Sequence, residues 1–199
     1  MKTKLFLAIF CISFAGLPTI SIAQTPASNN VQEHINGIPV YRQIGCFIAP
    51  ETVDSLIGAS DLIVIAKIKQ SIEEAKPVPQ FTNDGAIITT ISEVQGEISK
   101  VLKGNVNLKG KSIPIGQQAA MLTDKNKKRY ISTIEDYRPF KKGRYLLFLK
   151  RGLDGKRYFP VGVYYGKYNI DGIDNSEDAI QDKKFITIRK AVRQRFKLS

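Results

Sequence analysis

The sequence predicts a mainly β fold of the α+β class, in which a five-stranded barrel lies between a short N-terminal helix and a C-terminal amphipathic helix. About five runs rich in Val, Ile, Tyr and Phe have the length and alternation of β-strands. Loops rather than helices connect these runs, which favours an antiparallel barrel or sandwich. The tail instead places its apolar residues three and four positions apart, as an amphipathic helix does.

The first expected element is a short helix over residues 50–58. Pro50 suits its start, acidic side chains lie in its early turns, and Gly58 suits its end. Directly after it, residues 61–68 (DLIVIAKI) are rich in β-branched side chains and long enough for a central strand.

A long second strand is expected over residues 86–102. Gly96 within it predicts a bulge or a sharp bend, and strong coiling of one long strand allows a small barrel to close. Pro114 makes residues 111–116 a short edge strand, because proline has no N–H to donate to a ladder.

The rest of the chain completes the barrel. The remaining expected strands are 143–150 and 158–168, residues 76–85 are expected to be a loop, and residues 117–140 have the least regular pattern. Gly162 and Gly166 inside the last strand predict bending. Five strands fit a partly open OB-like barrel, of the oligonucleotide/oligosaccharide-binding type.

The C-terminal helix carries a clear apolar stripe opposite many Lys and Arg side chains. Phe185, Ile188, Val192 and Phe196 form the stripe. Such a stripe packs on a core by default; the alternative for a basic helix is an anionic membrane surface. The expected divisions of the chain are a signal peptide (1–23), a lead-in (24–49), the OB-like barrel domain (50–175) and the basic helix (176–199).

The N-terminus has the three parts of a secretory signal peptide. Lys2 and Lys4 precede an apolar run, and small residues precede an expected cut between Ala23 and Gln24. The apolar run is shorter than the roughly 20 residues that span a bilayer. The sequence therefore predicts an exported protein, periplasmic or extracellular, with no integral membrane segment after cleavage.

The chain is strongly basic, with 30 Lys and Arg, 18 Asp and Glu, and a formal net charge of +12. The expected cleavage removes only two of the lysines. Such an excess favours anionic partners, namely glycan, lipid or nucleic acid. It also keeps a protein soluble, which is the commoner reason for it.

Candidate catalytic and metal-binding groups are few. His34 is the only histidine and lies in the lead-in, whereas a nucleophile–base pair needs a positioned imidazole. One His and one Cys in the mature chain are too few for a structural zinc site. The acidic residues Asp171, Asp174, Glu177 and Asp178 lack the ligand pattern of a calcium loop and predict a solvated loop. No cofactor and no metal site are predicted.

Cys46 is the only cysteine that remains after the expected cleavage. It lies among apolar residues, which favours a buried thiol that acts as a small hydrophobe. A free reactive thiol and a disulfide to another chain are the alternatives.

Basic and aromatic residues alternate in the second half of the chain. Positive grooves with aromatic platforms bind single-stranded nucleic acid or sugar chains on barrels of this kind. The candidate binding face consists of Lys127, Lys128, Arg129, Tyr137, Arg138, Lys141, Lys142 and Tyr164. The interpretation that the sequence favours is a solvated charged surface over aromatic core residues, with the binding face as the alternative.

Three segments carry a family likeness: TVDSLIGASDLIVIAKI (52–68), ISEVQGEISKVLKG (91–104) and FKKGRYLLFLKR (140–151). Together they resemble the netrin-like domain, the fold of the tissue inhibitors of metalloproteinases and of many exported bacterial proteins. The resemblance implies an OB-like barrel. In the inhibitors a cysteine at the mature N-terminus binds the catalytic zinc; Gln24 stands there in this chain, so inhibition of metalloproteinases does not carry over.

These observations favour an exported, non-enzymatic binding module that acts on a protein partner in the cell envelope or outside the cell. One alternative is a binder of an anionic polymer or a membrane surface through the basic face. The least favoured alternative is a thiol-dependent enzyme that uses Cys46.

Overall fold

The structure is a computed structural model that describes residues 33–45, 47–81 and 87–198. The expected signal peptide (1–23), the first part of the lead-in (24–32) and Cys46 lie outside the described residues.

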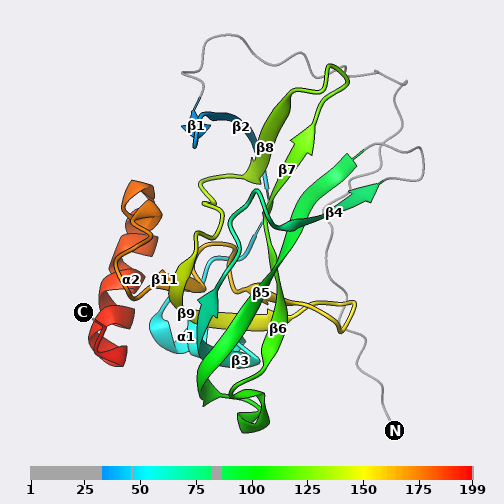
Figure 1. The fold of residues 1–199 in the computed structure, drawn as a ribbon. Helices are drawn as coiled ribbons and strands as arrows, with labels where there is room; N and C mark the ends of the chain where they lie inside the picture. The colour runs from blue at the N-terminus through cyan, green and yellow to red at the C-terminus, as the bar shows by residue number, and fades with distance from the viewer. Residues whose placement is uncertain (1–32, 46, 82–86, 199) are drawn as a thin grey trace, which may run out of the picture. The chain divides into compact units, whose positions relative to one another are not determined.

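Five strands form a closed barrel (Figure 1). They are β3 (Leu62–Ile68), β5 (Ile87–Lys103), β6 (Ser112–Gln117), β9 (Gly143–Arg151) and β10 (Tyr158–Pro160). Antiparallel ladders join β6 to β5, β5 to β3, β3 to β9, and β9 to β10. A parallel contact between Tyr158 of β10 and Ile115 of β6 closes the ring. The predicted mainly β fold with an OB-like barrel is therefore confirmed.

The long strand β5 is irregular, but not at the predicted place. Its register with β3 shifts near Leu102 and again near Ser99, which are the extra residues of the ladder. Gly96 has another role: a Cβ atom there would lie 2.5 Å from Cδ1 of Ile115 in the neighbouring strand β6. Glycine therefore permits close packing inside the barrel at this point.

The two helices lie on either side of the barrel strands in the sequence, as predicted. Helix α1 (Val53–Ala59) begins after Thr52 rather than at Pro50, because the Thr52 side chain accepts a hydrogen bond from the N–H of Ser55 and the Ser55 side chain accepts one from Thr52. Leu56 is its fully buried residue.

Helix α2 (Lys183–Phe196) begins later than the predicted residue 176. Asp182 caps its N-terminus, because the Asp182 side chain accepts hydrogen bonds from two backbone N–H groups of the first turn. A short 3-10 helix, η2 (Ser176–Ala179), precedes it. Phe185, Ile188 and Val192 are buried, and the Phe196 ring lies 5.5 Å from that of Phe148 in β9. The apolar stripe packs on the barrel. Within the described ranges, no helix is long and apolar enough to cross a membrane.

A second sheet is formed by part of the lead-in and by part of residues 117–140, the segment with the least regular sequence pattern. It contains β1 (His34–Ile35), β2 (Ile38–Gln43), β8 (Arg129–Ile134) and β7 (Ala119–Thr123), in that order. Strand β2 runs parallel to β8, although about 90 residues separate them in the sequence. Because this sheet depends on pairing between strands that are far apart in the sequence, the periodicity of each segment does not predict it.

Two further segments differ from their predictions. Residues expected as a loop form β4 (Lys76–Phe81), an edge strand on β5 that tolerates its prolines because one side is unpaired. The strand expected over 158–168 is interrupted: β10 ends at Pro160, a turn follows, and β11 (Lys167–Asn169) rejoins β9. A 3-10 turn, η1 (Val106–Leu108), connects β5 and β6.

Candidate functional site

The eight residues of the predicted binding face lie in two separate places. Lys127, Lys128 and Arg129 lie at the free end of the β7–β8 hairpin. The other residues follow the opposite end of β8 or lie in the turn between β10 and β11. Since β8 has six residues, the two groups are separated by roughly 20 Å of strand. The eight residues therefore do not form one continuous face.

The two tyrosines of that face belong to the core. Tyr137 is 1% exposed and Tyr164 is 7% exposed. The Tyr164 ring stacks on Tyr165 with centroids 5.0 Å apart, and its hydroxyl donates to Asp182 at 3.0 Å. Because both rings are buried, neither is available as a stacking platform for a ligand. Burial of their apolar surface instead stabilises the domain.

The three remaining cations make ion pairs within the protein. Arg138 pairs with Glu33, Lys141 lies 3.8 Å from Asp174, and Lys142 lies 2.8 Å from Glu74. Their charges are partly compensated. Lys141 and Lys142 are nevertheless exposed, as are Lys127 and Lys128 at the end of the β7–β8 hairpin, which form no ion pair with a carboxylate of the described residues.

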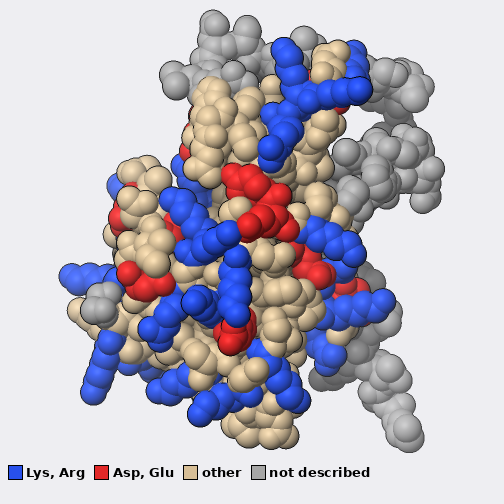
Figure 2. Space-filling view, viewed as in Figure 1, with Lys and Arg blue, Asp and Glu red and all other residues tan. Residues whose placement is uncertain are grey.

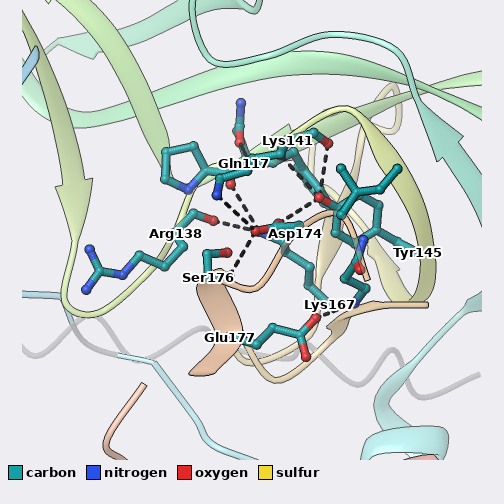
Figure 3. Close-up of polar contacts among 12 residues, drawn as sticks. Gln117, Arg138, Lys141, Tyr145, Lys167, Asp174, Ser176 and Glu177 are labelled. Atoms are coloured by element: carbon teal, nitrogen blue, oxygen red, sulfur yellow. Dashed lines mark hydrogen bonds and ion pairs between the residues drawn. The ribbon is translucent and has the colours of Figure 1, made fainter. Parts of the chain in front are cut away.

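Lys167, in β11, is the centre of a buried charged cluster (Figure 3). Its ammonium group donates to the backbone oxygens of Arg138 at 2.8 Å and Pro139 at 3.2 Å, and lies 3.5 Å from Oδ2 of Asp174. The rings of Tyr137, Phe140 and Tyr145 surround it at 4.8–5.6 Å. Burial lowers the pKa of Lys167, against the opposing attraction of Asp174 and Glu177.

Asp174 is the carboxylate partner of this lysine, and its side chain is completely buried. It accepts from the hydroxyl of Tyr145 at 2.7 Å and from the N–H of Ser176 at 3.0 Å. Burial alone would raise its pKa, but Lys167 and these hydrogen bonds outweigh burial and hold the pKa of Asp174 below its ordinary value of 3.8. The expected solvated loop is therefore wrong for Asp174, and equally for Glu177, which is 4% exposed.

The substitution Asp174→Asn is expected to reduce stability at neutral pH and to matter less in acid. A carboxylate with a depressed pKa contributes stability above its unfolded-state pKa and loses it as the pH falls through the folded-state pKa. The difference in free energy of unfolding between wild type and variant should be constant from about pH 5 to 7 and shrink below about pH 4. Urea unfolding followed by circular dichroism measures it; a difference that grows on acidification would contradict this role of Asp174.

Glu177 extends the cluster toward helix α2. Its carboxylate accepts from the N–H of Asn169 and lies 3.1 Å from Nε of Arg189. Burial raises its pKa. A cavity of about 10 Å³ lies beside it, lined by Arg138, Tyr164, Lys167, Ser176, Glu177 and Ile180. This volume suits about one water molecule and no organic substrate, so the cluster acts by joining β11, the loops and α2.

Sequence reasoning missed Lys167 altogether. From sequence alone, a single lysine in a tyrosine-rich stretch is expected to be exposed to solvent. The one indication that Lys167 is buried was its position within residues 158–168, which are otherwise apolar. Its partners lie up to 30 residues away in the sequence, so only folding brings them together.

An exposed apolar segment, defined here as Ile44, Gly45, Phe47 and Ile48, follows β2. Ile44 is 99% exposed and Ile48 is 92% exposed. The Phe47 ring packs against Tyr164 with centroids 5.6 Å apart, and the N–H of Gly45 donates to Oε1 of Glu135 at 3.0 Å. The segment is thus held to the protein while its two isoleucines point away from it.

Backbone strain occurs on both sides of this segment. Glu135 has φ of 47° and the β-branched Val163 has φ of 64°, in the left-handed region that such residues rarely adopt. Gly162, next to Val163, lies against Pro50 and the backbone oxygen of Ile48. Residues held in these conformations cost of order 1–3 kcal/mol each and concentrate at functional sites.

Within the described ranges, no group of three His, Cys, Asp or Glu side chains is placed to hold a metal ion. Comparisons of the chain with protein-family models, with curated proteins and with solved structures found no match.

Proposed function

We propose that this chain is an exported, non-enzymatic binding module, which acts on a protein partner in the cell envelope or outside the cell through the exposed apolar segment. The observation that carries the proposal is the near-complete exposure of Ile44 and Ile48. Their segment is held to the protein by the Phe47 ring and by the hydrogen bond from Gly45. The N-terminal sequence pattern supports export, and the likeness to the netrin-like domain supports a binding role.

A partner that buries the exposed isoleucines would gain a large favourable free energy of association. Complete burial of one such side chain contributes about 1.5–3 kcal/mol. Two of them at the centre of an interface would provide the apolar core that protein contacts require. A protein surface fits this shape better than a small ligand does, because both isoleucines project into solvent.

The segment is also organised before binding. Phe47 lies on Tyr164 and Tyr165, and Glu135 fixes the backbone at Gly45. A segment ordered in advance loses less conformational entropy when a partner binds. The strained conformations of Glu135 and Val163 support the same interpretation, since stability alone does not favour them.

We expect the double substitution Ile44→Ser, Ile48→Ser to abolish partner capture without a loss of stability. Tagged wild type and variant are incubated with envelope extract, and the bound proteins are quantified by mass spectrometry. Loss of two isoleucines that become buried in the complex should reduce partner recovery by at least about 10-fold. Both side chains are solvent-exposed, so the free energy of unfolding should change by less than about 0.5 kcal/mol.

Leu153→Ser is the matched control. Leu153 is fully exposed in the turn after β9 and lies about 100 residues from the apolar segment in the sequence. This control should recover the same partners as wild type. If no protein is enriched by wild type, or if both variants retain the same proteins, the proposed function is wrong.

A further inference from the structure

The free end of the β7–β8 hairpin is a rigid loop built on Asp124. One carboxylate oxygen of Asp124 accepts from the N–H groups of Asn126 and Lys128, both at 2.8 Å. Its N–H donates to the oxygen of Lys128 at 2.9 Å, and its own oxygen accepts from the N–H of Lys127 at 3.0 Å. The loop is therefore held by the Asp124 carboxylate and by backbone hydrogen bonds, and none of these bonds uses a lysine side chain.

Three lysines project from this loop: Lys125, Lys127 and Lys128, here named the lysine tip. All three are exposed, and Figure 2 shows Lys and Arg gathered at the free end of the hairpin. None of them forms an ion pair with a carboxylate of the described residues. Arg129 adjoins the tip, with its guanidinium resting on the sulfur of Met121.

One of these lysines occupies a position that favours glycine. Lys127 has φ of 61°, and the left-handed conformation costs a non-glycine residue about 1–2 kcal/mol. Hairpins of this kind ordinarily place glycine there. The chain therefore keeps a cation at the tip at some cost in stability.

Two aromatic side chains lie next to the tip. Tyr130 follows Arg129 in β8, and Tyr41 of β2 packs edge-to-face on it with centroids 5.3 Å apart. Tyr41 is 46% exposed. Tyrosine rings prefer the boundary between water and an apolar phase, because the ring is apolar and the hydroxyl is polar.

We propose that the lysine tip binds the phosphate groups of an anionic lipid surface. Lysine binds phosphate as a flexible point charge, whereas recognition of one phosphate in a fixed orientation favours arginine. The tip is the projecting end of a hairpin, and its three lysine side chains are exposed. A plane of lipid phosphates suits such an end, whereas single-stranded nucleic acid is bound in a groove that follows its backbone.

The test compares two triple variants of the purified, processed protein. One replaces the tip (Lys125→Gln, Lys127→Gln, Lys128→Gln); the control replaces three exposed lysines elsewhere (Lys100→Gln, Lys109→Gln, Lys111→Gln). Both lose the same charge. Binding is measured by sedimentation with vesicles of phosphatidylcholine containing about one third phosphatidylglycerol, and with phosphatidylcholine alone.

Wild type should bind the anionic vesicles, with an affinity that falls steeply as salt is added. The tip variant should bind on the order of 100-fold more weakly, and the control should bind much nearer to wild type. Equal losses in both variants would overturn the proposal, because net charge alone would then explain binding. Absence of vesicle binding, or tighter tip-dependent binding to a single-stranded oligonucleotide, would also overturn it.

Discussion

Replacement of Lys167 by methionine should lower the free energy of unfolding by about 3–5 kcal/mol, because it leaves a buried carboxylate without its cation. Methionine fills a similar volume, so the change tests the charge rather than the packing. It removes the partner of Asp174 and two hydrogen bonds to the backbone oxygens of Arg138 and Pro139. Urea unfolding of the purified protein measures the loss.

Two further variants make this prediction specific. Lys150→Met changes an exposed lysine of β9 and should shift the free energy of unfolding by less than about 0.5 kcal/mol. Addition of Asp174→Leu to Lys167→Met should recover part of the lost stability, because no unpaired buried charge remains. If Lys167→Met unfolds at the same urea concentration as Lys150→Met, the cluster does not stabilise the domain.

Gly166→Ala should lower the free energy of unfolding by about 2–3 kcal/mol through overpacking. A Cβ atom at Gly166 would lie 2.5 Å from the backbone oxygen of Phe148 and 2.5 Å from the backbone N of Val161. Both atoms belong to the place where β9 changes partner from β10 to β11. Backbone there cannot move without breaking the ladder, so the strain has no easy release.

The same substitution should have the opposite effect at Gly58. This glycine is exposed within helix α1, and no atom lies within 4 Å of its expected Cβ position. Alanine there should raise the free energy of unfolding by about 0.5–1 kcal/mol, since it restricts the unfolded chain and favours the helix. Equal effects of the two substitutions, measured by thermal and urea unfolding, would show that close packing at Gly166 does not matter.

The barrel strands were predictable because each carries its own signal. Residues 61–68 and 143–150 are β-branched or aromatic runs of strand length, and they became β3 and β9, paired along their whole length. The C-terminal stripe was equally local, since Phe185, Ile188 and Val192 lie on one helical face whatever they contact. Burial of these residues follows from their own spacing.

The second sheet was not predictable in this way. Strand β2 is short and mixed in polarity, and it becomes a strand by pairing with β8. The interruption between β10 and β11 also depends on distant backbone, because β9 offers partners to both. Periodicity describes one segment at a time and carries no information about which segment lies beside it.

The candidate sites also combine features that local sequence predicts with features that depend on tertiary contacts. Local sequence identified the basic residues of the hairpin, since charge and exposure need no partner. It left open whether Tyr137 and Tyr164 lie on a binding face or in the core, because aromatic residues occur in both, and the structure places them in the core. It also gave no weight to Ile44 and Ile48, because only the structure shows that they are exposed while Phe47 packs on Tyr164.

Local sequence was sufficient to predict the mainly β class, the barrel strands and the two helices, because hydrophobic spacing within a segment fixes which face that segment buries. The tertiary structure was needed to show how the ring closes, through Tyr158 and Ile115. It also decided that Lys167 meets Asp174 in the core and that the basic residues divide into a hairpin tip and a paired group. These outcomes depend on which distant segments come together, and on the burial that follows from it.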